Sequence, residues 1–228
     1  MDSQDILAER VSSVRSRVAA ACERVGRDPA GVTLIAVTKT TDTTTAARLP
    51  SLGVSDLGES RPQELWKKAA EIPDVRWHFI GHLQRNKLDR TVPLVHLIHS
   101  ADSERLLEAF DALGRKCGTP IPVLLEVNCS REAAKSGFAP EGIPTIGDRV
   151  MSLVGVRVDG LMTMAAHHDD PEQCRPTFAE LRELRDALRS RTGLALPFLS
   201  MGMSHDFEIA IEEGATHIRL GTMLFEGL

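Results

Sequence analysis

Lys39 stands where a lysine can do covalent chemistry. It follows the apolar run LIAV in the segment LIAVTKT, which is typical of a buried strand and the turn after it. An amine at the end of such a strand can attack an aldehyde and form a Schiff base. A lysine that merely ends a strand and reaches water looks the same in sequence. The assignment of Lys39 as a Schiff-base lysine therefore needs supporting evidence from other residues of the sequence.

Small polar residues near the C-terminus are suited to holding a phosphate. Ser200, Gly202 and Ser204 follow the apolar run PFL, and Gly221 and Thr222 follow the run HIRL. Small residues let backbone N–H groups approach an anion, and the start of a helix favours negative charge. These segments predict a phosphate site to which Ser200, Gly221 and Thr222 contribute.

Arg219 lies inside the last apolar run, between Ile218 and Leu220. Burying a lone charge is costly, so a guanidinium in this place requires a partner. The partner is either a bound ligand or a carboxylate of the protein, such as Glu126.

Other polar residues have simpler structural explanations. In the segment DLGESRPQE, Ser60 can cap a helix that begins near Arg61, and Glu59 is expected to be a solvent-facing loop carboxylate. Metal binding is not expected from the histidines, which lie at strand ends and in loops: His78 and His82, His96 and His99, and His167–Asp170. In the last group an Asp is expected to cap the next helix.

Eight short apolar runs alternate with helix-like segments. The predicted strands are Val32–Lys39, Ser55–Gly58, Arg76–Ile80, Leu97–Ser100, Pro122–Asn128, Val158–Met164, Pro197–Met201 and His217–Gly221. The predicted helices include 4–25, Arg61–Ile72, Glu104–Lys116, Pro171–Thr192 and Asp206–Gly214, with Gly26 ending the first.

Several of these strands are apolar on both faces, as in parallel sheets covered by helices. Eight such units in 228 residues predict a single (β/α)8 barrel over residues 1–228, with a doubly wound open sheet as the alternative. In a closed barrel the first and eighth strands are neighbours. Lys39 and the phosphate site could then hold one ligand, and pyridoxal 5′-phosphate carries both an aldehyde and a phosphate.

Composition narrows the class of partner. The net charge is −5, and no long run of Lys or Arg suggests nucleic acid or an anionic membrane as a partner. No apolar run approaches the roughly 20 residues of a membrane span. Four scattered cysteines without CxxC spacing fit a reducing compartment. We therefore expect a cytoplasmic protein.

The order of motifs resembles a known family. The segments AVTK, GESRPQE, WHFIGHLQRNK, EVNCSREAAKSGF, GLMTM and LSMGMSHDFEIAIEEGATHIRLGT are similar to those of the pyridoxal phosphate homeostasis proteins of the YggS/PROSC type. The similarity covers nearly the whole chain. That family in turn resembles the barrel domain of alanine racemase, which belongs to fold type III of pyridoxal phosphate proteins.

The resemblance implies a role for each candidate residue. Lys39 would form the Schiff base, and Arg219 would face the pyridine nitrogen. The phosphate would be held by Ser200, Gly221 and Thr222. Ser60 stands where the family usually has Asn, and Lys135 matches a second lysine of the family.

The resemblance also implies a carrier or regulator of the cofactor pool, acting as a monomer and passing cofactor to apo-enzymes that depend on it. An amino-acid racemase of fold type III is the alternative, and a barrel for another phosphate compound is a third. The chain contains no tyrosine and ends directly after the last strand, so the second acid/base group of alanine racemase and the domain that supplies it are not expected. A non-enzymatic role is therefore predicted.

Overall fold

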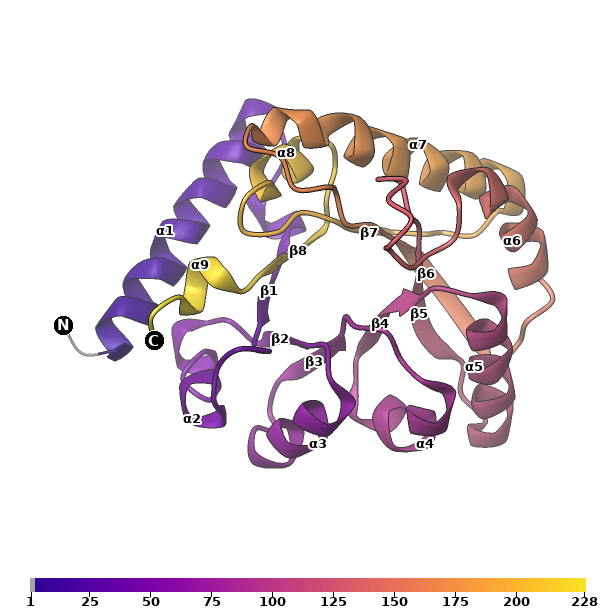
Figure 1. Ribbon diagram of the computed structural model, residues 1–228, viewed down its shortest axis with the longest axis horizontal. Helices are drawn as coiled ribbons and strands as arrows, with labels where there is room; N and C mark the ends of the chain where they lie inside the picture. The colour runs from indigo at the N-terminus through magenta and orange to yellow at the C-terminus, as the bar shows by residue number, and fades with distance from the viewer. Residues whose placement is uncertain (1–2) are drawn as a thin grey trace.

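The computed structural model describes residues 3–228, and it forms a closed barrel of eight parallel strands in the order β1 to β8 (Figure 1). The strands are β1 Thr33–Val37, β2 Asp56–Glu59, β3 Arg76–Phe79, β4 Leu97–Ala101, β5 Ile121–Glu126, β6 Val156–Met162, β7 Phe198–Ser200 and β8 His217–Leu220. All eight predicted strands are confirmed to within two residues at each end. The barrel closes through β1 and β8, where Ile35 pairs with Arg219, so the open-sheet alternative is wrong.

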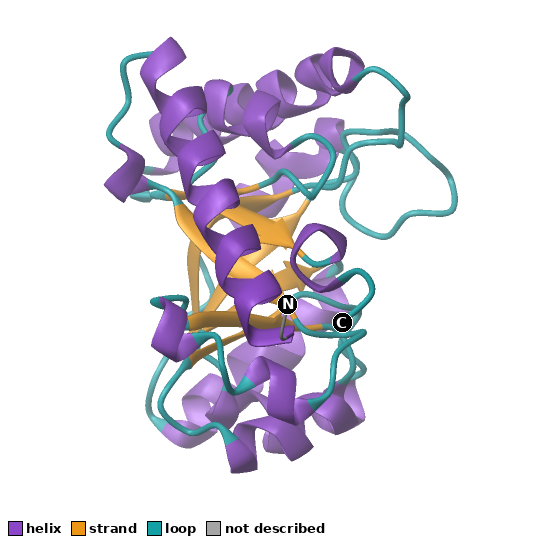
Figure 2. Ribbon diagram, turned by 90° about the vertical axis from the view of Figure 1, so that its left-hand side faces the viewer, coloured by secondary structure: helices purple, strands orange, loops and turns teal. Residues whose placement is uncertain are grey.

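Helices surround the barrel. They are α1 Ser3–Arg24, α2 Thr43–Ala46, α3 Pro62–Glu71, α4 Leu88–Thr91, α5 Glu104–Cys117, α6 Ile143–Val150, α7 Arg175–Thr192, α8 Phe207–Glu212 and α9 Thr222–Phe225. Six short 3-10 turns join them, at Pro29–Gly31, Pro50–Leu52, Arg85–Lys87, Val92–Leu94, Pro140–Gly142 and Pro171–Cys174. Figure 2 shows the strands at the centre, the helices outside them, and long loops projecting from one end of the barrel.

Alternation along each strand separates two cores. In β8, Ile218 and Leu220 point outward into the large apolar core between strands and helices. In β3, Trp77 and Phe79 do the same. Their neighbours face the barrel axis, where a small apolar cluster of Leu97, Leu124 and Met162 is joined by many buried polar side chains. The barrel interior is therefore unusually polar.

Helix α1 covers the part of the barrel formed by the end of the chain. Gly26 follows it with a φ of +65°, as expected for a residue that stops a helix. Its side chains form ion pairs with α8, from Arg17 to Glu208 and from Arg24 to Glu212. The guanidinium of Arg10 also donates to the carbonyl of Leu224 in α9. These contacts hold α1 against α8 and α9 on the outside of the barrel (Figure 1).

None of the described helices is both long and apolar enough to cross a membrane. Within residues 3–228 no group of three or more His, Cys, Asp or Glu side chains is placed to hold a metal ion.

Candidate functional site

A cavity of about 890 Å³ opens at the C-terminal ends of the strands, where sites of such barrels lie. Five of the six predicted site residues line it: Lys39, Ser60, Arg219, Gly221 and Thr222. They come from the ends of β1, β2 and β8, which are neighbours in the barrel. The fold therefore brings these predicted residues together.

Lys39 lies two residues beyond β1 with its side chain exposed at the cavity. The residue before it, Thr38, is fully buried and fixes the turn. The Thr38 N–H donates to the carbonyl of Gly58 at 2.8 Å, and the ammonium of Lys68 donates to the carbonyl of Thr38 at 2.6 Å. The lysine thus projects from a rigid base into open space.

Glu59 is completely buried, so its expected place in a solvent-facing loop is wrong. Its Oε2 pairs with the ammonium of Lys68 at 2.8 Å, and its Oε1 accepts the N–H of Ser60 at 2.8 Å. The carboxylate therefore anchors the end of β2 beneath the cavity. The sequence did not indicate this because Lys68 lies on the next helix, nine residues away.

Ser60 does not cap α3, contrary to expectation. Arg61 occupies the cap position with extended backbone and makes no side-chain cap bond, and α3 begins at Pro62. Ser60 instead lines the cavity, and its backbone packs on Gly81, where an added Cβ would lie 2.2 Å from the carbonyl oxygen of Ser60. Glycine at position 81 thus allows β2 and β3 to end side by side.

Arg219 is only 5% exposed, yet it reaches the cavity wall. Its Nη1 donates to the hydroxyl of Ser200 at 2.6 Å, and its Nη2 donates to the carbonyl of Thr163 at 2.9 Å. Burial lowers the pKa of Arg219 to about 10, which leaves the guanidinium charged at neutral pH.

The suggested ion pair between Arg219 and Glu126 does not form. Arg219 donates to two uncharged oxygens, those of Ser200 and Thr163, and Glu126 accepts from the hydroxyl of Ser136 at 2.7 Å. Burial raises the pKa of Glu126. A cationic group that is buried with neutral partners and faces a cavity is suited to a polar or anionic ligand.

Ser200 is fully buried behind Arg219 and does not line the cavity. Its hydroxyl is engaged by Arg219 and by Nδ1 of His99 at 2.8 Å. Ser204, in the same segment, lines the cavity instead, and its hydroxyl accepts the N–H of Met223 at 3.3 Å. Both serines lie in the segment LSMGMS, and spacing alone does not distinguish them.

Lys135 does not line the cavity, but its ammonium donates to the carbonyl of Met164, a lining residue, at 3.3 Å. The same ammonium donates to the carbonyl of Ala165 at 2.9 Å and pairs with Glu132.

The expected capping of the next helix by an Asp of the loop 167–170 is confirmed. Asp170 accepts the N–H of Glu172 at 3.0 Å, at the start of the turn Pro171–Cys174 that leads into α7.

The fold and site define a barrel of one class: residues 10–228 match the family described as the N-terminal domain of alanine racemase. The pyridoxal phosphate homeostasis protein of Aquifex aeolicus is 43% identical over 219 residues, which are 95% of this chain and 96% of that protein. The protein of the same name from Pseudomonas aeruginosa is 39% identical over 96% of this chain and 94% of its own length. This chain belongs to the pyridoxal phosphate homeostasis protein family.

A solved structure shows the same architecture. PipY of Synechococcus elongatus, whose structure has PLP bound, is 33% identical and superposes with a TM-score of 0.84. The likeness covers 96% of this chain and 99% of that one.

Proposed function

We propose that this chain binds pyridoxal phosphate through a Schiff base on Lys39 and serves to store it and pass it on. The observation that carries the proposal is the shared cavity, in which an exposed amine, a buried guanidinium and the small residues of the last two loops meet. The names of the relatives and the PLP bound to PipY support the choice of ligand.

The residues of the cavity fit the three parts of this ligand. The amine of Lys39 can bind its aldehyde, and the apolar side chains of Val37, Ile80 and Met164 offer surfaces for its ring. The third part is the phosphate, for which the cavity offers Ser204 and the loop Gly221–Thr222. When bound, the ligand supplies an electron-withdrawing ring.

The position of Arg219 favours a role in binding the cofactor over a role in catalysis with it. We propose that this guanidinium faces the ring nitrogen. A guanidinium donates hydrogen bonds and accepts none, so it keeps the nitrogen unprotonated. An unprotonated ring withdraws electrons less strongly and is a poorer partner for carbanion chemistry.

The proposed role is therefore not enzymatic. Two-base racemisation needs acid/base groups on both faces of the reacting carbon, and the sequence contains no tyrosine for the second face. We place the protein in the cytoplasm because all four cysteines are free, as suits a reducing compartment. We also propose that it acts as a monomer and that apo-enzymes receive its cofactor.

Two measurements on the loaded protein test this function. Mixing it with an apo-form pyridoxal phosphate enzyme should restore that enzyme's activity, as exchange between the two proteins requires. Incubation with L-alanine or L-serine should change chirality no faster than free pyridoxal phosphate does. Saturable racemisation that is lost in Lys39→Ala would contradict the proposed carrier function and show that the protein is an enzyme.

A further inference from the structure

A continuous chain of hydrogen bonds crosses the barrel interior behind the cavity. It starts at Arg219 and passes to the hydroxyl of Ser200 at 2.6 Å. From Ser200 it continues to Nδ1 of His99 at 2.8 Å, and Nε2 of His99 lies 2.9 Å from Nδ1 of His78. Nε2 of His78 reaches Oδ1 of Asp56 at 3.0 Å. All five side chains are buried, and each comes from a different strand.

The two ends of the chain set its direction. Arg219 only donates, so Ser200 must accept from it and donate its own proton to His99. An ionised Asp56 only accepts, so His78 must donate to it through Nε2 and accept from His99 through Nδ1. Both histidines then carry their proton on Nε2. Burial holds the pKa of His99 well below its usual value and lowers that of His78, so both rings are neutral.

Other ionisable groups surround the chain without interrupting it. The ring of His96 lies edge-on to that of His78, with centroids 5.8 Å apart, and the ring of His217 lies tilted to it at 6.1 Å. Nδ1 of His217 bonds to the hydroxyl of Thr216. Burial outweighs the favourable effect of Asp56 and lowers the pKa of His217 to about 3, so this neighbour is also uncharged.

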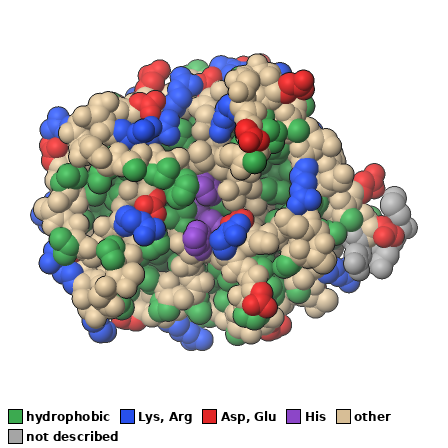
Figure 3. Space-filling view, turned by 180° about the vertical axis from the view of Figure 1, so that it is seen from behind, with side chains coloured by type: hydrophobic (Ala, Val, Ile, Leu, Met, Phe, Trp, Pro, Cys, Tyr) green, Lys and Arg blue, Asp and Glu red, His purple; other side chains and the backbone are tan. Residues whose placement is uncertain are grey.

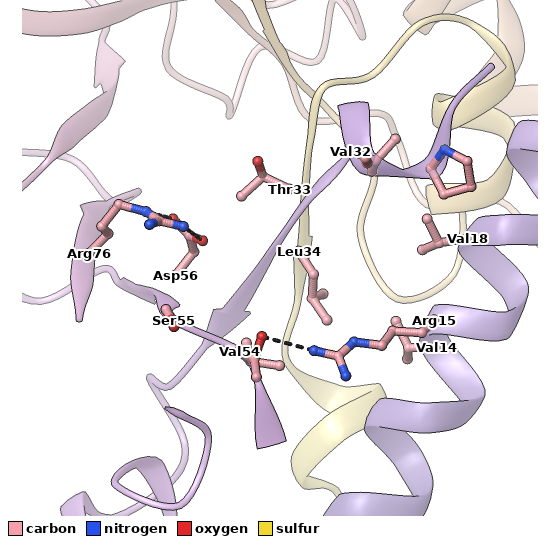
Figure 4. Close-up of a pocket in the computed structure, with 13 residues that line it drawn as sticks. Val14, Arg15, Val18, Val32, Thr33, Leu34, Val54, Ser55, Asp56 and Arg76 are labelled. Carbon is pink, nitrogen blue, oxygen red and sulfur yellow. Dashed lines mark hydrogen bonds and ion pairs between the residues drawn. The ribbon is translucent and has the colours of Figure 1, made fainter. Parts of the chain in front are cut away.

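The far end of the chain lies at the opposite face of the barrel. Oδ1 of Asp56 accepts from Nε of Arg76 at 2.7 Å, and both residues line a second cavity of about 480 Å³ (Figure 4). Burial raises the pKa of Asp56, but the hydrogen bonds from His78 and Arg76 outweigh it, and the pKa falls to about 2. Figure 3 shows histidine side chains gathered at the centre of this face among basic and acidic ones.

We propose that Ser200, His99, His78 and Asp56 are positioning residues that orient Arg219 toward the bound ligand. Each donor in the chain has one acceptor, so Asp56 determines the tautomer of His78, which determines that of His99. His99 in turn makes Ser200 present a lone pair to Arg219. Were the direction lost, the hydroxyl of Ser200 could turn its proton toward the guanidinium and release it. This inference rests on the proposed function, since it assigns Arg219 to the ligand.

Nitrogen NMR of histidine side chains in the unloaded native protein tests the chain without any ligand. Two buried histidines should show a protonated Nε2 and a bare Nδ1, and both should be neutral at about pH 7. Mixed tautomers, or protonation of His99 near the usual value, would overturn the proposal. This measurement stands even if the protein were to bind no pyridoxal phosphate, in which case only the proposed function would fail.

The variant Asp56→Asn tests whether the far end of the hydrogen-bond chain affects ligand binding at Arg219. An amide both donates and accepts, so it no longer forces the direction of the chain. The tautomers of His78 and His99 should change, and pyridoxal phosphate should bind about 2- to 30-fold more weakly.

The matched control is Asp159→Asn. Asp159 pairs with Arg157 on β6 as Asp56 pairs with Arg76, but its carboxylate bonds to that arginine and to no histidine of the described residues. Binding should stay within about twofold of native in this variant. Equal affinities of the two variants for pyridoxal phosphate, or unchanged histidine signals in Asp56→Asn, would contradict the proposed role of the hydrogen-bond chain.

Discussion

The ammonium of Lys68 lies 2.8 Å from Oε2 of Glu59, and both side chains are closed off from solvent. The same ammonium donates to the carbonyl of Thr38, and the same carboxylate accepts the N–H of Ser60. One buried ion pair therefore joins the ends of β1 and β2. It holds the backbone next to Lys39, so its loss affects both stability and the site.

Replacing Lys68 by Met should lower the free energy of unfolding by about 3–5 kcal/mol, because Glu59 is left buried without its partner. The double variant Lys68→Met, Glu59→Gln should recover part of this loss. Urea unfolding measures both. The exposed pair Arg191–Asp148 offers the control, and Arg191→Met should have a much smaller effect. A single variant as stable as the native protein would contradict the structural role of the pair.

Lys39→Ala should abolish covalent attachment of pyridoxal phosphate and leave the fold intact, because the side chain is exposed and builds no core. Borohydride reduction followed by peptide mass analysis gives the position of the adduct. Lys135→Ala is the control and should keep it. An adduct found mainly on Lys135 in the native protein would show that Lys39 is the wrong lysine.

Thr222→Val and Ser204→Ala should each weaken binding of pyridoxal phosphate by about 1–3 kcal/mol, as when a charged partner loses a hydrogen bond. Titration of the visible absorbance measures the affinity, and the exposed Ser190→Ala is the control. Pyridoxal, which lacks the phosphate, should bind the native protein much more weakly. Equal affinity for the two compounds would contradict the proposed phosphate site. Ser200→Ala should also weaken binding, but through Arg219.

Stability should fall as the pH falls below about 6.5, the usual pKa of histidine. Burial lowers the pKa of His217 to about 3, so below pH 6.5 the unfolded chain takes up a proton that the folded chain does not. The unfolded state is then favoured as acid is added. At pH 5 His217 alone should remove about 2 kcal/mol, and the lowered pKa values of His78 and His99 act in the same direction.

Urea unfolding at about pH 7.5 and pH 5 measures this dependence. In His217→Gln the difference between the two pH values should be smaller, because one titrating group is gone. An unfolding free energy that does not change between them would show that these histidines are protonated in the folded protein.

The strands and the cavity lysine could be predicted because their signals are local. A strand buried on both faces is a continuous apolar run, and Lys39, Gly221 and Thr222 directly follow such runs. Arg219 could be predicted from its place inside one, because burying an unpaired charge is costly. These inferences need only the neighbouring residues.

The partners of the buried polar groups could not be predicted in this way. Lys68 pairs with Glu59 because it lies on the face of α3 that packs against the barrel. Ser200 bonds to His99, which is 101 residues away in the sequence. Ser200 is the last residue of β7 and its side chain points into the barrel, whereas Ser204 lies in the loop that follows and lines the cavity. The sequence does not show where the strand ends. Such relations arise from closure of the barrel.

The packing of α1 has a consequence for the order of events during synthesis. Arg17 and Glu208 are 191 residues apart, and Arg24 and Glu212 are 188 apart. A ribosome releases α1 long before it makes α8 and α9, so the apolar face of the helix has no native partner for most of translation. Contacts this distant in sequence form slowly and leave apolar surface exposed meanwhile. The nascent chain therefore carries an exposed apolar face on α1 until its last elements emerge.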